Sequence, residues 1–531
     1  MVGVSNHQPR FRNRSDAVSM KKSLRSHLSA KVLSFKRGYR RALFVRVGLF
    51  LLPLVAFLLA SCTDDVHYSA DPSLRLRFDA DTVAFDPLLT GVGSSTAVLG
   101  VYNPSREHLS IAQVTLAGGS ASPFRVNVDG QYGTSFADVE LRSRDSLFVF
   151  IEVTPPVADA DAPLVREDSL VFTLQSGVQQ RVVLTVWGQD AVVLRGAVLD
   201  VPTVFTPRRP YLIYDSLVVA PTATLTLQPG TQLLFHHKAE LIAHGTLQAL
   251  GTPDSLVVLR GDRLDNMFSY LPYDRINGQW GGITLHPAAD VHRLDYCDIH
   301  GGEYGIRAAS TLDEPLLFSM QGTQVHNVDG DALQATLCDG VAVNCLFTNA
   351  GGHCVDVLGG AITFLHCTIA NFFPWKAERG EAVHICNVLT EGEGSEARNI
   401  LYPLTGVDFI SCIITGSKDD EVSGTVTEGG DTLDLRAAAQ YSFSHSLVNS
   451  KEDDSPHFTD ICWESPDSAL YGRQNFVHIN ADNTFRYDFH LDSLSRARGI
   501  ADDRLLPDAP LDRDGRERTA PADAGCYQYR P

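Results

Sequence analysis

Several features that mark common protein classes are absent from this 531-residue sequence. Its ten cysteines include no Cys-x-x-Cys pair, which removes the usual signature of a structural zinc site. Long stretches with the apolar period of an amphipathic helix are also absent, whereas glycine and proline recur along the chain. Together these observations favour an all-β protein. A chain of this length has room for two or three domains.

Positive charge is scarce outside the N-terminal region. The whole chain has a formal net charge of −19, while its first 61 residues carry twelve Lys or Arg and one Asp, a surplus of +11. Removing that region leaves a body near −30 without a basic stripe. Because such a body repels a phosphate backbone, we expect no nucleic-acid partner.

The N-terminal region has the composition of a leader. Its basic residues precede an apolar run from Val47 to Ala60, whose 14 residues are too few to span a bilayer but suit the core of a signal peptide. The sequence leaves open whether translation starts at Met1 or Met20. Residues 59–62, Leu-Ala-Ser-Cys, resemble a bacterial lipobox, with a plain secretory signal as the alternative. The resemblance implies that Cys62 carries lipid and anchors the protein in the outer membrane.

Two further features bear on the compartment. The acidic residues that follow Cys62 resemble the surface-export tag of some Gram-negative lipoproteins. With Cys62 assigned to lipid, nine cysteines remain, and an odd number cannot be fully paired within one chain. Several of them fall at strand positions that should face a core, where a thiol acts as a small apolar filler. We therefore expect mostly buried, unpaired thiols.

Three asparagines recur at a fixed spacing of 22 residues: Asn327, Asn349 and Asn371. Bulky apolar and small residues keep the same offsets before each of them. A fixed period in the low twenties with a strand-like composition predicts a solenoid in which each repeat is one coil. Asparagine tolerates the left-handed backbone of a sharp turn, and stacked amides can bond along the axis. We therefore expect a ladder of these side chains at a common corner.

Each coil should place alternate residues of a strand in the interior. One coil offers Val343, Cys345 and Phe347 for this role, and later coils repeat the pattern. The equivalents are Leu365, Cys367 and Ile369, then Ile410, Cys412 and Ile414, with Cys297 and Ile299 earlier and Ser446 and Val448 later. The longer step from Cys367 to Cys412 predicts an insertion or an extra coil around 372–405.

The repeat resembles the asparagine ladder of right-handed parallel β-helices of the pectate-lyase-like kind, over roughly residues 200–450. Short strands separated by turn residues across 217–283 resemble the first coils of bacterial β-helix proteins. Trp280, within them, is expected in the core or at a cap. The alternative is chance spacing in a β-sandwich.

Residues 74–187 have a different pattern of apolar and polar residues. About nine short alternating strands suggest an antiparallel sandwich. Asn103-Pro104, Phe124 and residues 153–155 lie where immunoglobulin-like domains of the spindle-protein and cilia type carry similar residues. The expected fold class is therefore all-β, with an N-terminal immunoglobulin-like β-sandwich followed by a right-handed parallel β-helix.

Five segments are expected along the chain. They are a lipoprotein signal peptide at 1–61, a lipid-anchored tether at 62–72, the sandwich at 73–190, the β-helix at 191–450 and a capping segment at 451–531. A cap is needed because the last coil exposes unpaired backbone groups and an apolar cross-section. Motifs in the last segment resemble the ends of surface β-helix lipoproteins. Asp512 and Asp514 resemble the first ligand positions of a calcium-binding loop, but the other ligand positions of that motif are not present in the sequence. We therefore interpret the two aspartates as part of a polar turn.

Catalysis on polysaccharides needs its own test, because a fold does not imply an activity. Lyases of the resembled family need calcium-binding carboxylates and a basic residue, and hydrolases need two carboxylates that flank the bond. The pectin-hydrolase motifs are not reproduced. Gly352-His353-Cys354 matches only part of one of them. Paired aspartates elsewhere lie in acidic, loop-like runs that solvation explains.

One polar cluster is a weak candidate for acid–base or metal chemistry. His300 and His326 follow the last inward positions of their coils, so they should lie outward and close together. Carboxylates and a third histidine occupy the neighbouring turns. The full set of candidates is His300, His326, Glu303, Asp329, Asp331 and His353. The alternative is that these turns are polar only for solubility.

The expected function is that of a lipid-anchored cell-envelope protein, facing the cell surface, whose β-helix is a rigid non-catalytic surface. Its expected partners are the membrane, through the lipid, and polysaccharide or other envelope proteins. Phe372, Phe373 and Trp375 follow Asn371 and either grip such a partner or fold back over the coil. The alternative function is a surface polysaccharide lyase or glycoside hydrolase. No cofactor or metal is expected, although calcium is left open.

Overall fold

The computed structural model describes most of the chain after the leader. The described residues are 67–311, 314–392, 398–428, 431–434, 440–464, 472–480 and 484–531. The expected signal peptide, Cys62 and most of the tether lie outside them. Within the described residues, no helix combines the length and the apolar character that a membrane crossing requires.

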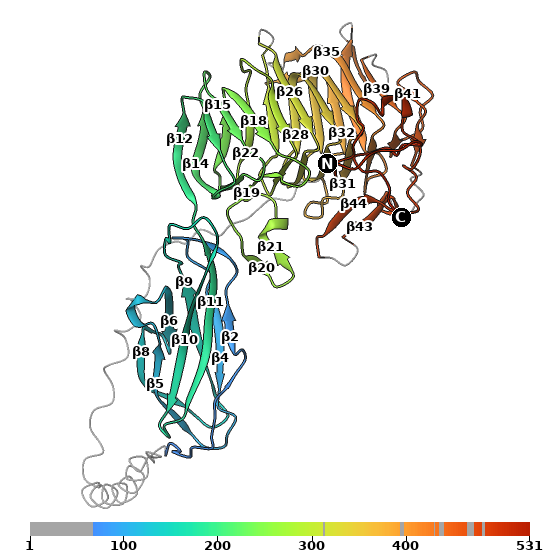
Figure 1. Cartoon of the computed structure of the whole chain (residues 1–531). Coiled ribbons are helices and arrows are strands. Elements are labelled where there is room, and N and C mark those ends of the chain that lie inside the picture. Colours follow the sequence, from blue (N-terminus) through green and yellow to red (C-terminus); the bar gives the residue numbers. More distant parts are fainter. Residues whose placement is uncertain are drawn as a thin grey trace, which may run out of the picture. The chain divides into compact units, whose positions relative to one another are not determined.

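The first folded part is a sandwich of two sheets (Figure 1). One sheet holds, in spatial order, β1 (Arg77–Phe78), β4 (Ala97–Tyr102), β9 (Ser146–Val153), β6 (Phe124–Val128) and β7 (Gln131–Gly133). The other holds β2 (Thr82–Ala84), β11 (Gln179–Gln189), β10 (Leu164–Leu174), β5 (Leu109–Leu116) and β8 (Ser135–Leu141), with β3 (Leu88–Leu89) beside β11. Alternate residues of β9, such as Val149 and Ile151, are buried, while Phe148 and Phe150, which alternate with them, are exposed. The expected immunoglobulin-like sandwich is confirmed.

The second part is a parallel β-helix, in which three ladders of strands form the three faces of the coil (Figure 1). The first face holds β12 (Val192–Leu199), β14 (Tyr211–Val219), β17 (Glu240–Ala243), β22 (Gly282–Leu285), β25 (Ile306–Ala309), β28 (Leu333–Val343), β30 (Val355–Leu365), β32 (Val383–Cys386) and β37 (Val422–Glu428). The second holds β13 (Thr203–Phe205), β15 (Thr224–Leu227), β18 (Thr246–Leu250), β23 (His292–Asp295), β26 (Leu316–Gln321), the later halves of β28 and β30, β35 (Leu404–Ile410), β39 (Tyr441–Ser444) and β41 (Phe458–Thr459).

The third face carries the candidate site. It holds the start of β14, then β16 (Gln232–Phe235), β19 (Val257–Gly261), β24 (Cys297–His300), β27 (Gln324–Val328), β29 (Leu346–Ala350), β31 (Thr368–Asn371), β36 (Ile413–Gly416), β40 (Leu447–Val448) and β42 (Cys462–Trp463). Hairpins leave the coils at β20 (Asn266–Phe268) and β21 (Leu271–Pro272), at β33 (Val388–Glu391) and β34 (Arg398–Leu401), and where β38 (Asp431–Asp434) pairs with β37. Short 3-10 turns lie at Gly119–Ala121, Tyr273–Arg275, Arg473–Asn475 and Asp503–Leu505. The parallel β-helix and its repeat are confirmed.

Like side chains stack in the core because equivalent residues of successive coils are about 4.8 Å apart. Phe364, Phe409 and Phe443 stack with ring-centroid distances of 4.7 Å at each step. Trp280 is fully buried and stacks on Phe235 at 4.3 Å, so the sequence placed it correctly in the core. The stacked columns make the body of the helix a single apolar core.

One detail of the expected coil is wrong. Residues 343–347 are not one strand, because Asn344 adopts a left-handed backbone, with φ 54°, between β28 and β29. The bend shifts the alternation, so Ala342 is fully buried in place of Val343, whereas Cys345 and Phe347 face inward as expected. The same shift keeps Leu365 and Ile410 out of the core cluster.

Left-handed residues form a continuous column at the corner between the second and third faces. Each donates its backbone N–H to a carbonyl oxygen of the next coil, at 2.7–3.0 Å. Only one member is an asparagine, so a search for repeated asparagines does not find the column. The members are Tyr296, Gly322, Asn344, His366, Ser411 and His445, with φ between 47° and 61°.

The three spaced asparagines lie at the opposite ends of the third-face strands, at successive rungs of one corner. Asn327 and Asn349 both have φ 53°, but Asn371 is not among the left-handed residues. The Asn371 amide donates to the carbonyl oxygens of Ala350 and Gly380, at 3.0 and 3.1 Å. The buried Oδ1 of Asn349 has no hydrogen-bond partner, so Asn371 does not donate to it. The common corner is present, and Asn371 bonds to backbone instead of extending an amide ladder.

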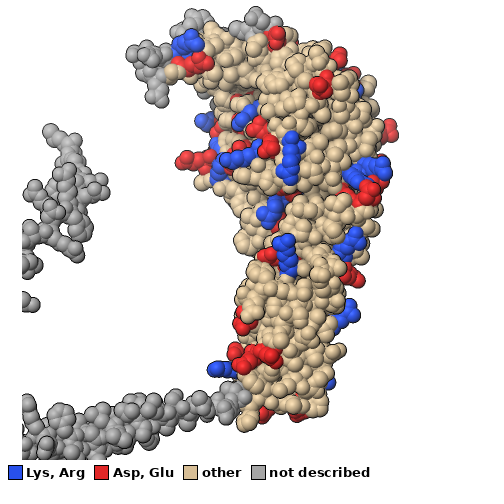
Figure 2. All heavy atoms as spheres, turned by 90° about the vertical axis from the view of Figure 1, so that its left-hand side faces the viewer, with Lys and Arg blue, Asp and Glu red and all other residues tan. Residues whose placement is uncertain are grey.

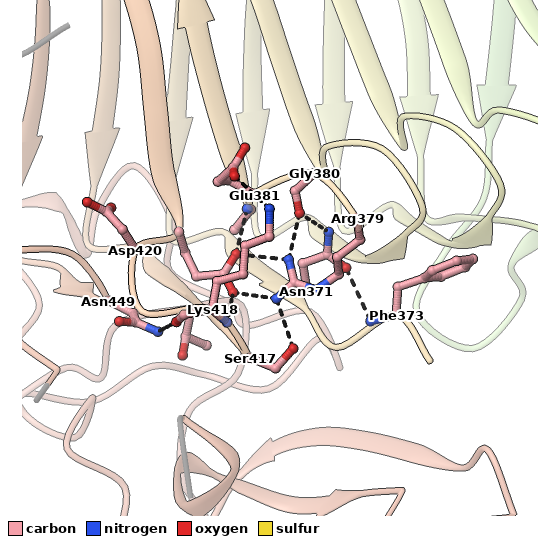
Figure 3. Close-up of polar contacts among 12 residues, drawn as sticks. Asn371, Phe373, Arg379, Gly380, Glu381, Ser417, Lys418, Asp420 and Asn449 are labelled. Atoms are coloured by element: carbon pink, nitrogen blue, oxygen red, sulfur yellow. Dashed lines mark hydrogen bonds and ion pairs between the residues drawn. The ribbon is translucent and has the colours of Figure 1, made fainter. Parts of the chain in front are cut away.

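The expected insertion after Asn371 is present. It consists of residues 372–382 and the β33–β34 hairpin, which together explain the long step between cysteine positions. Figure 3 shows Asn371, Arg379, Lys418 and Asn449 in polar contacts around this insertion. Arg379 and Glu421 form an ion pair whose side chains are 3% and 0% exposed, with 2.5 Å between Nη2 and Oε1.

The aromatic residues of the insertion fold back. Phe372 and Phe373 are buried, and the half-exposed Trp375 stacks on Phe485 at 4.4 Å. Phe485 lies between the two strands of a C-terminal hairpin, β43 (Phe476–Ile479) and β44 (Tyr487–Leu491). This hairpin and the segment after it pack along the third face, on an apolar strip of the outer surface. The strip consists of Leu346, Ala370, Ile413 and Leu447, and the covering residues include Phe476, Phe489, Leu491, Ala524 and Tyr527.

The cysteine prediction is confirmed for the described residues. All nine described cysteines are free thiols, and seven of them are buried. Cys345, Cys367 and Cys412 form one inward column, each with a sulfur that contacts a backbone carbonyl oxygen at 3.3–3.6 Å. Asp512 accepts the N–H groups of Asp514 and Arg516, which is the geometry of the polar turn inferred from the sequence.

Candidate functional site

The outer surface of the third face brings together two histidines and an aspartate. Asp298 and His300 lie two residues apart on β24, so both point to the same side of the strand. His326 on β27 is the register partner of His300 in the next coil. The two imidazole rings stack with their centroids 4.8 Å apart. The expected proximity of the two histidines is confirmed, although His300 is only 4% exposed.

One oxygen of Asp298 serves both histidines. Its Oδ1 lies 2.9 Å from Nδ1 of His300 and 3.0 Å from Nε2 of His326. The remaining nitrogen of His300, Nε2, lies 3.0 Å from Oδ1 of Asp274, which also pairs with Arg260. His300 is therefore held between two carboxylates. The indole N–H of Trp280 donates to the His300 carbonyl at 2.8 Å and fixes the backbone at this point.

These contacts determine the charge state of the group. Burial by itself would lower the pKa of His300, but the charge of Asp298 and the hydrogen bonds to both carboxylates raise that pKa to about 9. The hydrogen bond from His300 lowers the pKa of Asp274 to about 2. Despite its burial, Asp298 has a pKa well below the usual value because His300 and His326 stabilise its anion. At neutral pH the group thus contains a charged His300 between two anionic carboxylates.

A second polar group lies on the first face. Asp356 on β30 is the register partner of His384 on β32, and its Oδ1 lies 2.7 Å from Nδ1 of that histidine. His353 stacks on His384 at 4.7 Å and accepts the backbone N–H of Glu381 on its Nδ1, at 3.1 Å. Burial would lower the pKa of His384, but Asp356 raises it, whereas burial and the charge of His384 lower the pKa of His353. Cys386 lies two residues beyond His384 on the same side of β32.

The six predicted residues therefore do not form one site. His300 and His326 belong to the third-face group, whereas His353 belongs to the first-face group together with Asp331, whose Oδ1 accepts the His353 backbone N–H at 2.7 Å. Burial raises the pKa of Asp331. Asp329 instead pairs with Lys376 at 3.0 Å and accepts from Asn277. Glu303 has an exposed side chain.

Sequence analysis missed the carboxylates that matter most. Asp298 precedes His300 by two residues on a strand, and an Asp-x-His pair with this spacing is a signal that could have been found. Asp274 comes from the hairpin region before Trp280, 26 residues from His300, and no local pattern links the two. The C-terminal hairpin was also missed as a neighbour of this face.

A cleft of about 280 Å³ opens beside the third-face group, between the coils and the C-terminal hairpin. A second hollow of about 500 Å³ adjoins it and shares five of its lining residues. We call the two together the hairpin groove. Its shared residues are Gln324, Leu346, Arg486, Tyr487 and Phe489. At one end lie Asp274 and His326, and at the other His490 and Tyr527.

One buried polar atom in the groove lacks a partner. Asn349 lines the cleft, is 1% exposed, and has no hydrogen bond to its Oδ1. Buried polar atoms are almost always satisfied, so this oxygen is expected to accept from a small polar group such as an ordered water. Thr348 and Asn327 line the same cleft beside it.

Comparisons with known proteins leave the chain without an assigned family. No family model matches it, and no curated protein matches it. Among solved structures, the ASH/PapD-like domain 7 of human CEP192 is 14% identical and aligns over 25% of this chain and 96% of its own length, with a TM-score of 0.17. A protein of unknown function from Porphyromonas gingivalis W83 is 16% identical over 24% of this chain and 59% of its own, with a TM-score of 0.16.

A third similar structure, the Caenorhabditis elegans protein WR4 of the MSP family, is 14% identical over 21% of this chain and 96% of its own, with a TM-score of 0.15. TM-scores this low support neither a fold nor an activity for this chain.

Proposed function

We propose that this protein is a lipid-anchored component of the bacterial cell envelope and that its β-helix, of the right-handed pectate-lyase-like kind, binds a glycan in the hairpin groove without cleaving it. The observation that carries the proposal is the groove itself. Aromatic rings, an amide and a guanidinium line a continuous hollow on a rigid ladder of strands. Sugar binding needs this combination of flat apolar surface and directed hydrogen-bond groups.

The groove also has the right elongation for a chain-like ligand. Its two hollows adjoin at Tyr487, which belongs to both. Asn349 lines the cleft beside it, with an Oδ1 that has no hydrogen-bond partner within the protein. Arg486 is exposed and supplies donors at the junction. A ligand that runs along the hairpin would contact all three.

Charge favours a neutral or mixed ligand over a polyanion. The body carries a large negative net charge, and on the face in Figure 2 acidic and basic side chains are interspersed. Electrostatic attraction would therefore contribute little to binding a uronic-acid polymer. The groove can instead provide short-range contacts to a neutral glycan.

A polysaccharide-cleaving enzyme is the second candidate, supported by the proton-carrying Asp274–His300–Asp298 group at the end of the groove. A glycosidase needs two carboxylates that flank the bond, one as acid and one as base or nucleophile. Here Asp298 is already bound to two histidines, so it is poorly placed to act on a sugar. Binding without cleavage is the better-supported function.

The test is a glycan array followed by titration calorimetry on the purified full chain, with and without calcium. Arg486→Ala should weaken binding about tenfold, which corresponds to the loss of roughly 1.4 kcal/mol from one contact. Arg106→Ala is the matched control, because Arg106 is an exposed arginine on the sandwich. Equal affinity of wild type and Arg486→Ala would exclude the groove. Release of shortened chains that is lost in His326→Ala would show an enzyme instead of a binder.

A further inference from the structure

The third-face group has the composition of a metal site, with Asp298 as a ligand that the sequence analysis did not include in its candidate cluster and that the glycan proposal leaves without a metal role. Asp298, His300 and His326 each offer one ligand atom, and the three atoms lie within 4.8 Å of one another. Two imidazole nitrogens and one carboxylate oxygen form a ligand set that suits zinc and its first-row neighbours, whereas calcium takes six to eight oxygens. We propose that this group binds a divalent transition-metal ion of the zinc class through Asp298 Oδ1, His300 Nδ1 and His326 Nε2.

Two of the three separations between the ligand atoms are close to those around a bound zinc ion. Ligand atoms about 2.0–2.1 Å from a tetrahedral zinc ion lie roughly 3.3 Å apart. Oδ1 of Asp298 is 2.9 Å from one imidazole nitrogen and 3.0 Å from the other. These two separations need to change by only a few tenths of an ångström, and the third, between the two imidazole nitrogens, lies within 4.8 Å. The ion takes the place of the two protons that now bridge these atoms.

A supporting residue already holds the first histidine in position. Histidines that bind a metal usually donate their other ring N–H to a carboxylate, which fixes the ring and increases its basicity. Nε2 of His300 lies 3.0 Å from Oδ1 of Asp274, which has this role. Arg260 pairs with Asp274 from the other side. Asp274 is thus a positioning residue and not a ligand.

The site has access to solvent and to the groove. His326 and Asp274 both line the cleft of about 280 Å³, and the His326 side chain is 23% exposed. An ion bound by three protein atoms would keep its fourth position open toward this cleft. That position can hold water or a ligand hydroxyl. The inference does not depend on glycan binding, because the ion is measured without any sugar.

The first-face group is the alternative binding site for the ion. Asp356, His384 and Cys386 also offer three ligand atoms within 4.8 Å of one another. The first-face group differs from the third-face group because it offers a thiolate, from Cys386, in place of one imidazole. A thiolate ligand gives cobalt(II) a sulfur-to-metal charge-transfer absorption in the near ultraviolet. The third-face group contains no sulfur, so cobalt bound there lacks this band. Spectroscopy can therefore separate the two groups.

The experiment is zinc titration calorimetry and metal analysis of the purified full chain after treatment with a chelator. We expect one zinc equivalent at the third-face group, at least about 100-fold weaker binding in His326→Ala and in His326→Gln, and about 10- to 100-fold weaker binding in Asp274→Asn. His490→Ala is the matched control, since His490 also lies between two carboxylates, 2.6 and 3.0 Å away, without a second histidine. It should bind zinc like the wild type.

Circular dichroism confirms that each variant is folded, and His326 faces outward, so its loss leaves the core intact. Unchanged zinc affinity in both folded His326 variants overturns the proposal, as does the absence of any zinc equivalent in the wild type. A cobalt spectrum with the sulfur band, abolished by Cys386→Ser, would assign the ion to the first-face group and also overturn it.

Discussion

The buried imidazole of His366 makes a sharp prediction for acid stability. His366 is 0% exposed, and neither of its ring nitrogens has a hydrogen-bond partner. Burial, followed by the nearby charge of Arg518, lowers its pKa to about 3, against the opposing effects of the nearby Asp523 backbone and of Asp502. The folded protein therefore keeps His366 neutral, while the unfolded chain binds a proton near pH 6.5.

The sign of the effect follows from this difference. Between about pH 6.5 and about pH 3 the unfolded state binds the additional proton, so the free energy of unfolding falls as the pH falls. Each pH unit in this window removes up to roughly 1.4 kcal/mol, and the full loss approaches about 5 kcal/mol. Between pH 7 and pH 4 this one residue accounts for about 3 kcal/mol.

The perturbation is His366→Asn. Asparagine tolerates the left-handed backbone at this position, where φ is 49°, and the preceding coil already carries Asn344 in the same column. The smaller side chain leaves a cavity, so the variant should be less stable than the wild type at pH 7 by about 1–3 kcal/mol. Between pH 7 and pH 4 the wild type should lose about 3 kcal/mol more stability than the variant, because the variant lacks the titrating group. The stability difference between the two proteins should therefore shrink or change sign at pH 4.

The assay is urea unfolding at pH 7, 6, 5 and 4, followed by fluorescence of the buried Trp280 and by circular dichroism. Trp280 lies in the β-helix core, so its signal reports the part that contains His366. His366→Gly is a second neutral variant that also accepts positive φ. A stability difference that stays constant with pH in both variants would refute the reasoning.

Three further predictions concern other parts of the chain. Arg379→Met should lower the free energy of unfolding by about 3–5 kcal/mol in urea titrations, because it leaves the buried Glu421 charge without its partner. Asn344→Ala should destabilise by roughly 2–4 kcal/mol, since it strains a left-handed position and removes the side-chain oxygen that accepts from Arg518, whereas Asn344→Gly should avoid the strain and lose only that hydrogen bond. Cys62→Ser should abolish incorporation of labelled palmitate into the protein isolated from growing cells, and continued labelling of the protein would contradict the lipid anchor.

The sequence predicted the architecture well because the repeat is local and periodic. Asn327, Asn349 and Asn371 share a corner, and Cys345 and Cys367 share an inward column, since strand alternation and coil length are both readable from spacing. The bend at the other corner was not predicted. Its residues are chemically unlike one another, and left-handed backbone is enforced there by stacking instead of by residue type.

The candidate site was predicted only in part. The proximity of His300 and His326 follows from equal positions in adjacent coils, which a period can reveal. Asp274 and Tyr487 reach the same surface through contacts between distant segments, and nothing in the spacing encodes such contacts. His353 was wrongly joined to the first two because its turn belongs to a different face of the coil.

A glycan bound in the hairpin groove should protect the backbone amides that line it. Hydrogen–deuterium exchange of the full chain, with and without a glycan selected from the array, tests it most directly. We expect slower exchange confined to Gln324–Val328, Leu346–Ala350 and Tyr487–Leu491, the three strands that line the groove. Protection confined to the sandwich or to the first face, with these three strands unchanged, would contradict it.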